Sequence, residues 1–414
     1  MLKTTMRLKK KTILLFAVPI LVTSMVFFTL PFFDVRATKP SAVETQQENL
    51  GCLRPVSENF FTANELSKKT RKFSRKADHF PESRLRVDTS KDEQKCPDLY
   101  RIARDMLNGE KIKLPHETNR TRWKFREPVD FNVLSKTNLH WNHPWEQGDS
   151  VETRRRFEHY NVTASTIRAR KYLITYGHNC CKESKIRAVN KAIDVAKVDY
   201  AETFDLSDIS VPFQISHRKV LRRRKGAGYW LWKPYIILKT LLTKMNDGDM
   251  LMYNDAGTYW IKDAGPIFKV CMETKHNIVS FHQPYQESEY SKRDAFVLMD
   301  MDDPRVYQKG QTQRMDGFIV LMKTCKTIQF AMEFLAYTAD GRITTDDKNV
   351  MGKPNFPNFK GNRHDQTVFS LLTKKWGVLE LRDPCTCGRN GFGRDYGHAS
   401  GPYYQLYVND RNLN

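Results

Sequence analysis

The hydrophobic and polar positions divide the chain into three parts. The run from Ile13 to Phe33 is apolar and uncharged, the stretch from Asp34 to about Arg168 is polar with little apolar periodicity, and from Lys171 onward short apolar runs alternate with segments of helical spacing. A run of roughly 20 apolar residues is long enough to cross a bilayer. We therefore expect a cytoplasmic tail over 1–12, a transmembrane signal anchor over 13–33, a partly ordered stem over 34–168 and a folded domain over 169–414.

The folded part predicts an α/β domain. Runs of β-branched and aromatic residues bounded by glycine or polar residues are typical of strands, and apolar residues at three- and four-residue spacing are typical of helices. The expected strands are 172–177, 198–204, 249–253, 277–282 and 317–322. The expected helices are 183–197, 211–220, 229–245, 294–299, 326–337 and 366–375. Strands that alternate with helices indicate an open α/β sheet with helices on both faces.

The stretch from Gly226 to Gly257 organises this domain. It reads as a glycine turn, a helix and a buried strand that runs directly into a carboxylate, Asp255, followed by two small residues. The carboxyl ends of strands in such sheets form the edge at which ligands bind. Small residues there let a bulky ligand approach the backbone closely.

The motifs of this stretch resemble those of GT-A-type glycosyltransferases. The pattern is Gly-x-Gly-Tyr-Trp-x-Trp-Lys-Pro-Tyr-x-x-x-Lys, then Gly-Asp-x-x-x-Tyr-x-Asp-Ala-Gly, with Arg-His-Asp-Gln at 363–366, and the resemblance covers about 171–376. It implies a GT-A-like (Rossmann-like) open mixed sheet. It also implies transfer of a sugar from a nucleotide-sugar, expected to be a UDP-sugar, to a glycan hydroxyl.

The resemblance makes Asp255 the first candidate for catalysis. GT-A enzymes commonly carry Asp-x-Asp at this place, where the carboxylates hold Mn²⁺ or Mg²⁺ against the donor diphosphate, and both cations prefer oxygen ligands. Here Gly257 stands where the second acid is expected, with Asn254 as an additional donor-site candidate. The alternative is that Asp255 only caps the following turn.

Further donor-site candidates precede that strand. Glycines at a helix start direct backbone N–H groups towards a phosphate, and a lysine adds a positive charge. Tryptophan rings stack on a sugar or a base, although at least one tryptophan is expected to pack in the core. The candidates are Gly226, Gly228, Tyr229, Trp230, Trp232 and Lys233.

The Arg-His-Asp-Gln motif supplies the remaining catalytic candidates. Asp365 is expected to accept the acceptor hydroxyl's proton if the reaction inverts stereochemistry, and Gln366 to face the donor sugar; retention leaves the nucleophile open. His364 is an alternative metal ligand. The simpler alternative for Asp365 is a helix N-cap. Acceptor-cleft candidates from the same resemblance are Lys292, Asp294 and Gln313.

The net charge and the residues around the apolar run indicate the partners and the cellular location of the domain. The net charge of +21 is compatible with nucleic acid, an acidic glycan or donor phosphates, but the apolar run removes the nucleic-acid alternative. The basic residues before Ile13 keep the N-terminus cytoplasmic and the body luminal. The alternative of a cleaved signal peptide has a shorter apolar core and an Ala-x-Ala site, which is missing here. We expect a single-pass type II Golgi membrane protein.

Two sequons and eight cysteines fit that compartment. The glycosylation candidates are Asn119 and Asn161. Disulfides are expected in an oxidising lumen, with a connectivity that the sequence does not give. The rival function is a non-catalytic, membrane-tethered ectodomain that binds acidic glycans through its basic surface.

Overall fold

The computed structural model describes residues 90–115, 124–129, 162–381, 383–385 and 406–409. All of them belong to one compact unit, Val43–Asn414. The predicted tail and signal anchor, and both predicted sequons, lie outside the described residues. Within the described part, no helix combines the length and the apolar character needed to cross a bilayer.

A mixed sheet of six strands forms the centre of the described part, in the order β2-β1-β3-β6-β5-β7. Only β6 runs against its neighbours: it pairs antiparallel with β3 and β5, whereas the other pairings in this sheet are parallel. Its strands are β1 (Lys171–Tyr176), β2 (Tyr200–Phe204), β3 (Met250–Asn254), β5 (Ile278–Gln286), β6 (Thr312–Met322) and β7 (Leu379–Leu381). The predicted open mixed sheet is confirmed.

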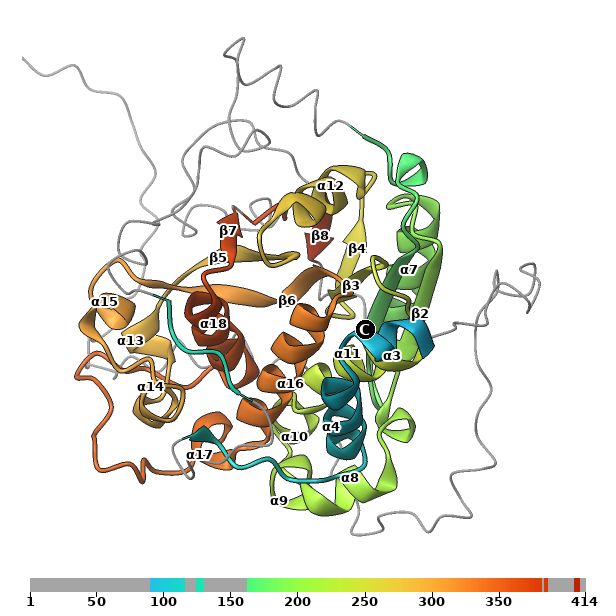
Figure 1. Cartoon of the computed structure of the whole chain (residues 1–414). Coiled ribbons are helices and arrows are strands. Elements are labelled where there is room, and N and C mark those ends of the chain that lie inside the picture. Colours follow the sequence, from blue (N-terminus) through green and yellow to red (C-terminus); the bar gives the residue numbers. More distant parts are fainter. Residues whose placement is uncertain (1–89, 116–123, 130–161, 382, 386–405, 410–414) are drawn as a thin grey trace, which may run out of the picture. The chain divides into compact units, whose positions relative to one another are not determined.

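Helices connect these strands (Figure 1). Those of eight or more residues are α4 (Pro97–Leu107), α7 (Lys182–Asp194), α11 (Trp232–Thr243), α12 (Gly265–Glu273), α16 (Cys325–Ala339) and α18 (Asp365–Trp376). The shorter ones are α3 (Ser90–Lys95), α8 (Val211–Ser216), α9 (Arg218–Leu221), α10 (Gly226–Tyr229), α13 (Glu287–Tyr290), α14 (Arg293–Leu298), α15 (Pro304–Tyr307) and α17 (Gly341–Thr344). A second small sheet pairs β4 (Thr258–Trp260) with β8 (Tyr407–Asn409).

Helices cover both faces of the main sheet. Successive residues of a strand point to opposite faces, and in β3 the side chains of Leu251 and Tyr253 join one hydrophobic cluster while those of Met250 and Met252 join another. The first cluster includes residues of α4, α11, α16 and α18; the second includes residues of α7 and α12. The predicted arrangement of helices on both faces is therefore confirmed.

The helix α4 lies inside the range predicted as stem, yet it packs on the core. Tyr100, Ile102 and Met106 are buried in the first cluster, and a disulfide joins Cys96, just before α4, to Cys325 at the start of α16. The expectation of disulfides is confirmed by this pair. Part of the predicted stem therefore belongs to the folded body.

Two predicted helix boundaries are wrong. The helix expected from Tyr229 begins at Trp232, because Gly226 through Trp230 all have positive φ and cannot continue a right-handed helix. The helix expected over 211–220 is two helices, α8 and α9, which meet at His217. The elements β4, α12, β7 and β8 are not among the predicted ones.

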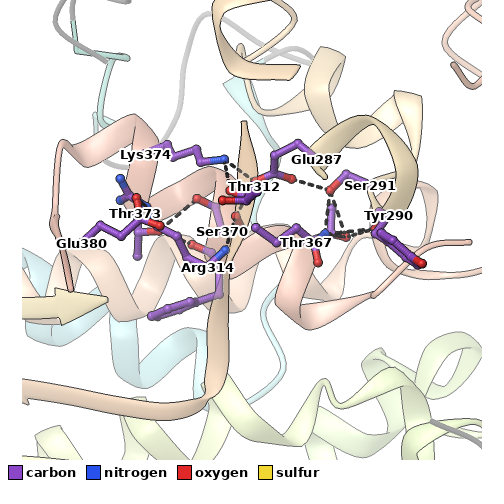
Figure 2. Close-up of polar contacts among 12 residues, drawn as sticks. Glu287, Tyr290, Ser291, Thr312, Arg314, Thr367, Ser370, Thr373, Lys374 and Glu380 are labelled. Atoms are coloured by element: carbon purple, nitrogen blue, oxygen red, sulfur yellow. Dashed lines mark hydrogen bonds and ion pairs between the residues drawn. The ribbon is translucent and has the colours of Figure 1, made fainter. Parts of the chain in front are cut away.

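A buried polar network fixes α18 against β6 and α13 (Figure 2). Lys374 Nζ lies 2.6 Å from Glu287 Oε1 and donates to the carbonyl oxygen of Thr312 at 2.7 Å. Ser291 Oγ donates to Glu287 Oε2 at 2.7 Å, and Ser370 Oγ also donates to Glu287. Burial lowers the pKa of Lys374, although Glu287 offsets part of the effect. This network fixes the middle and the last turn of α18, the helix that begins at Asp365.

Candidate active site

Two neighbouring strands bring carboxylates to one edge of the sheet. Asp255 follows the end of β3, and because β6 is antiparallel to β3, Asp316 in β6 lies at the same edge. The N–H of Asp255 donates to the carbonyl oxygen of Gly317 at 3.0 Å. A Cβ at Gly317 would lie 2.9 Å from Asp255 Oδ2, so the glycine makes room for the carboxylate.

A lysine joins three carboxylates at this edge. Nζ of Lys233, in α11, lies 2.6 Å from Asp316 Oδ2, 2.6 Å from Asp365 Oδ2 and 3.9 Å from Asp255 Oδ1. The contact with Asp316 is a hydrogen bond. Lys233 Nζ and Asp365 Oδ2 form an ion pair. We call Lys233, Asp255, Asp316 and Asp365 the lysine–aspartate cluster.

Burial and charge separate the pKa values within the cluster. For Lys233, burial opposes the charged form, but attraction to Asp316, Asp365 and Asp255 raises its pKa overall. For Asp316, burial opposes the charged form, but attraction to Lys233 together with hydrogen bonds from Asp365 and Lys233 lowers its pKa overall. Burial and the neighbouring Asp316 raise the pKa of Asp365 well above its ordinary value, and Lys233 offsets only part of this. Carboxylic acids whose pKa values are pushed apart can take different acid–base roles.

Asp255 is the most accessible member of the cluster. Its side chain is 33% exposed, against 7% for Asp316 and 5% for Asp365. The hydroxyl of Tyr253 donates to Asp255 Oδ1 at 2.8 Å and holds the carboxylate in place. Burial, then the charge of Asp255, raises the pKa of Tyr253, so this phenol stays a donor. A ligand therefore reaches the cluster at Asp255, with Asp316 and Asp365 behind it.

The Gly-Ala-Gly-Tyr-Trp segment forms a left-handed turn before α11. Gly226, Ala227, Gly228, Tyr229 and Trp230 have φ values of +57°, +49°, +99°, +52° and +58°. Such angles cost non-glycine residues roughly 1–2 kcal/mol each. Strained backbone of this kind is concentrated at functional sites. The segment thus has a geometric reason for its two glycines, which differs from the predicted helix-start phosphate contact.

This turn orients its aromatic side chains towards different partners. Trp232 stacks on Tyr176 with ring centroids 3.8 Å apart and donates from Nε1 to the carbonyl oxygen of Gly226 at 3.0 Å. It is buried, which agrees with the alternative that one tryptophan packs in the core. Trp230 is half-buried and stacks on His364 at 5.6 Å. The hydroxyl of Tyr229 donates to Asp346 at 3.1 Å.

His364 lies beside this turn rather than beside Asp255. Its Nδ1 faces the carbonyl oxygen of Thr344 at 2.6 Å, which assigns the proton to Nδ1. Burial lowers the pKa of His364 to about 4, although Asp346 offsets part of the effect, so the ring is neutral at pH 7. Its Nε2 has no hydrogen-bond partner among the described residues and lies 3.9 Å from Asp346 Oδ1. The predicted metal role of His364 stays a prediction.

The remaining candidate residues make contacts that are separate from one another. Gln366 donates to Gln313 at 2.7 Å, and Gln313 in turn donates to the carbonyl oxygen of Tyr290 at 3.0 Å. Asp294 accepts from the N–H groups of Val350 and Met351 and so holds that loop. The Nζ of Lys292 is buried and has no hydrogen-bond partner among the described residues. The structure does not gather Lys292, Asp294 and Gln313 into one contact.

The neighbours of Asp255 in the motif differ in accessibility. Asn254 is fully buried, and in the amide orientation that satisfies both of its ends it contacts the carbonyl oxygen of Tyr253 and Nε1 of Trp260. Gly257 is half-exposed in the turn that leads to β4. Asn254 therefore supports the strand end, whereas Gly257 is partly open to solvent.

A divalent metal does not fit the cluster as it is arranged. Asp255, Asp316 and Asp365 are all oxygen donors of the kind that Mn²⁺ and Mg²⁺ prefer. However, the ammonium of Lys233 lies within 2.6 Å of two of them and takes the position between them. Across the described residues, no three His, Cys, Asp or Glu side chains form a group suited to a metal ion.

Sequence reasoning missed Asp316 and Asp346. Asp316 immediately precedes Gly317, the first residue of a predicted strand, so a carboxylate-glycine step at a strand start was a visible signal. Its meaning depends on the antiparallel pairing of β3 with β6, which the sequence does not reveal. Asp346 carries no motif, and only its contacts with Lys225 and Tyr229 connect it to the turn.

Sequence comparison finds no matching family model and no matching curated protein. Among solved structures, the chain is similar to mouse xyloside xylosyltransferase 1 in its apo form, with 10% identity, a TM-score of 0.34 and coverage of 58% of this chain and 98% of the other. It is also similar to the galactosyltransferase LgtC in complex with donor and acceptor sugar analogs, with 12% identity, a TM-score of 0.34 and coverage of 58% and 87%.

A third similar structure is the apo form of the bifunctional glycosyltransferase WbbM, with 9% identity, a TM-score of 0.31 and coverage of 52% of this chain and 39% of the other. TM-scores below 0.5 do not establish a common fold. The function of this chain therefore has to be argued from its own residues.

Proposed function

We propose that the chain is a GT-A-like glycosyltransferase that moves a sugar from a nucleotide-sugar, specifically a UDP-sugar, to a glycan hydroxyl. The observation that carries this proposal is the lysine–aspartate cluster at the carboxyl edge of β3. One accessible carboxylate, Asp255, stands there in front of two buried ones. Ligands of open α/β sheets bind at this edge, and carboxylates accept hydrogen bonds from sugar hydroxyls.

The separated pKa values support an acid–base role for Asp365. A general base works best when its pKa lies near the working pH, and the pKa of Asp365 is raised well above that of an ordinary aspartate by burial and by Asp316. In an inverting transfer, the acceptor hydroxyl oxygen attacks the anomeric carbon while the bond from that carbon to the diphosphate oxygen breaks. The leaving diphosphate keeps the electron pair, and the hydroxyl proton passes to Asp365.

The other residues orient the donor. Asp255 is the accessible acceptor of hydrogen bonds, held by Tyr253. Lys233 keeps Asp316 ionised and fixes Asp365. Trp230, half-buried beside His364, offers an aromatic face for a ring of the donor. No step of this reaction is assigned to a metal, because Lys233 takes the position between the buried carboxylates.

The same proposal includes a location. The apolar run from Ile13 to Phe33, preceded by basic residues, supports a single-pass type II protein of the Golgi membrane with a luminal catalytic domain. The Cys96–Cys325 disulfide supports an oxidising compartment. Expression of the full chain with protease protection of intact Golgi vesicles tests this: a luminal body is protected, and a cytoplasmic one is digested.

Release of a nucleoside diphosphate tests the activity. The full chain, solubilised in mild detergent, is incubated with a panel of nucleotide-sugars and mixed glycan acceptors, once with Mn²⁺ and once with a chelator. Turnover of one donor, and its loss in Asp255→Asn, supports the transferase. The surface variant Asp98→Asn is the control, because Asp98 is 83% exposed on α4. Stabilisation by polyanions without turnover of any donor supports the glycan-binding alternative instead.

A further inference from the structure

Arg363, next to the cluster in both sequence and space, is held in a fixed orientation. Its guanidinium carbon lies 3.9 Å from the ring centroid of Tyr285. One guanidinium nitrogen donates to Gln366 Oε1 at 3.2 Å, and its backbone N–H donates to the carbonyl oxygen of Tyr290 at 3.1 Å. Stacking on an aromatic ring and a hydrogen bond to an amide orient the planar cation without neutralising it.

The positive charge of Arg363 has no carboxylate partner among the described residues. Arg293, Arg305 and Arg342 each pair with an aspartate at 2.5 to 2.8 Å. Arg363, in contrast, is half-buried, forms no ion pair with any described residue, and its Nε has no hydrogen-bond acceptor in that part of the chain. An oriented guanidinium with vacant N–H donors is the usual protein group for binding a phosphate or carboxylate in two-point geometry.

The charge of Arg363 also reaches the cluster. Burial raises the pKa of Asp316, but the charge of Lys233, hydrogen bonds with Asp365 and Lys233 and the charge of Arg363 together lower it. The cluster itself has three carboxylates and one lysine, so an anionic ligand is repelled unless a further cation lies beside it. Arg363 is placed to provide that cation.

We propose that Arg363 binds an oxyanion of the substrate beside the lysine–aspartate cluster. This inference rests on the proposed function, and it adds the group that lets an anion approach a site rich in carboxylates. The oxyanion has two sources with the same chemistry: the diphosphate of the donor, and a carboxylate on an acidic acceptor sugar. Tyr285 and Gln366 fix the guanidinium fork in advance, so less side-chain freedom is lost on binding.

Titration calorimetry on the detergent-solubilised full chain tests the proposal with inorganic pyrophosphate and with glucuronate. The wild type is compared with Arg363→Gln, which removes the charge, and with Arg363→Lys, which keeps a charge but removes the fork. Lys360→Gln is the matched control: it removes a neighbouring positive charge that is already paired with Glu289 at 2.9 Å. Thermal melts confirm that each variant is folded.

We expect at least one probe to bind the wild type, Arg363→Gln to bind it about tenfold more weakly or worse, and Arg363→Lys to recover only part of the loss. Lys360→Gln should bind as the wild type does. If Arg363→Gln weakens the binding of pyrophosphate, the oxyanion is the donor diphosphate. If it weakens the binding of glucuronate, the oxyanion is a carboxylate of the acceptor. Either result supports the site.

The proposal is overturned if neither probe binds the wild type, if Arg363→Gln binds as well as the wild type, or if Lys360→Gln loses as much affinity as Arg363→Gln. These outcomes do not require turnover. A protein that binds pyrophosphate through Arg363 but hydrolyses or transfers no nucleotide-sugar therefore contradicts the transferase and leaves the oxyanion site standing.

Discussion

Nζ of Lys233 donates to Oδ2 of Asp316 across 2.6 Å, and both side chains are almost fully buried. The two residues lie on different elements: Lys233 is in the first turn of α11, and Asp316 is in β6, which runs against the other strands of the main sheet. Their ion pair also fixes Asp365 at the start of α18. The site therefore depends on three segments that are distant in sequence.

The left-handed turn before α11 should tolerate no side chain at Gly228. A Cβ at Gly228, where φ is +99°, would lie 2.7 Å from the Cα of Leu221, which is backbone and cannot move cheaply. Gly310 has a similar φ of +93° and nothing within 4 Å. We expect Gly228→Ala to lower the free energy of unfolding by about 2–3 kcal/mol more than Gly310→Ala does. Urea denaturation of both variants measures this difference, and equal losses contradict the clash.

The buried ion pair of Lys374 and Glu287 should contribute strongly to the stability of the fold. Glu287→Gln leaves the ammonium of Lys374 buried without its counter-charge, and breaking such a pair costs about 3–5 kcal/mol. The control is Glu127→Gln, which breaks an exposed, solvent-screened pair with Lys124 and should change the free energy of unfolding far less than Glu287→Gln does. Chemical denaturation compares the two, and a similar small loss for both shows that the buried network does not hold α18 in place.

The buried His217 should make the free energy of unfolding depend on pH. Burial lowers the pKa of His217 from 6.5 to about 4, with partial compensation by the Phe213 carbonyl oxygen. The unfolded chain therefore binds more protons than the folded chain between pH 6.5 and 4, and the free energy of unfolding falls as the pH falls through this window. His217→Gln should remove up to about 3 kcal/mol of this pH-dependent loss.

Denaturation at pH 6.5 and at pH 4 measures that change. The slope will not vanish in the variant, because burial also lowers the pKa of His276 and His364 to about 4. An identical loss of stability in the wild type and in His217→Gln contradicts a neutral, buried His217.

Local patterns in the sequence were enough to predict most of the sheet and its helices. The alternation of apolar runs located β1, β2 and β3 to within a few residues, because buried strands and amphipathic helices leave strong periodic signals. The start of α11 was misplaced since a left-handed turn has no periodicity: Tyr229 and Trp230 look like helix residues and instead have positive φ.

The site was only partly visible in the sequence for a different reason. Lys233, Asp255 and Asp365 lie in motifs, so they were candidates from the start. Asp316 was not, because its role comes from the pairing of β6 with β3, and pairing between distant strands is a property of the folded chain. Asp316, on the neighbouring strand β6, adds a second carboxylate at the edge where Asp255 lies.

We propose the lysine–aspartate cluster as the reaction centre for sugar transfer. The most direct measurement is nucleoside diphosphate release from the nucleotide-sugar panel by the full chain, for the wild type, Asp316→Asn and the surface control Asp98→Asn. We predict turnover of one donor by the wild type and by Asp98→Asn. In folded Asp316→Asn the rate should fall about 100-fold or more, since Lys233 and Asp365 lose the charge that orients them. Wild-type turnover that persists in Asp316→Asn, or no turnover of any donor, contradicts the account.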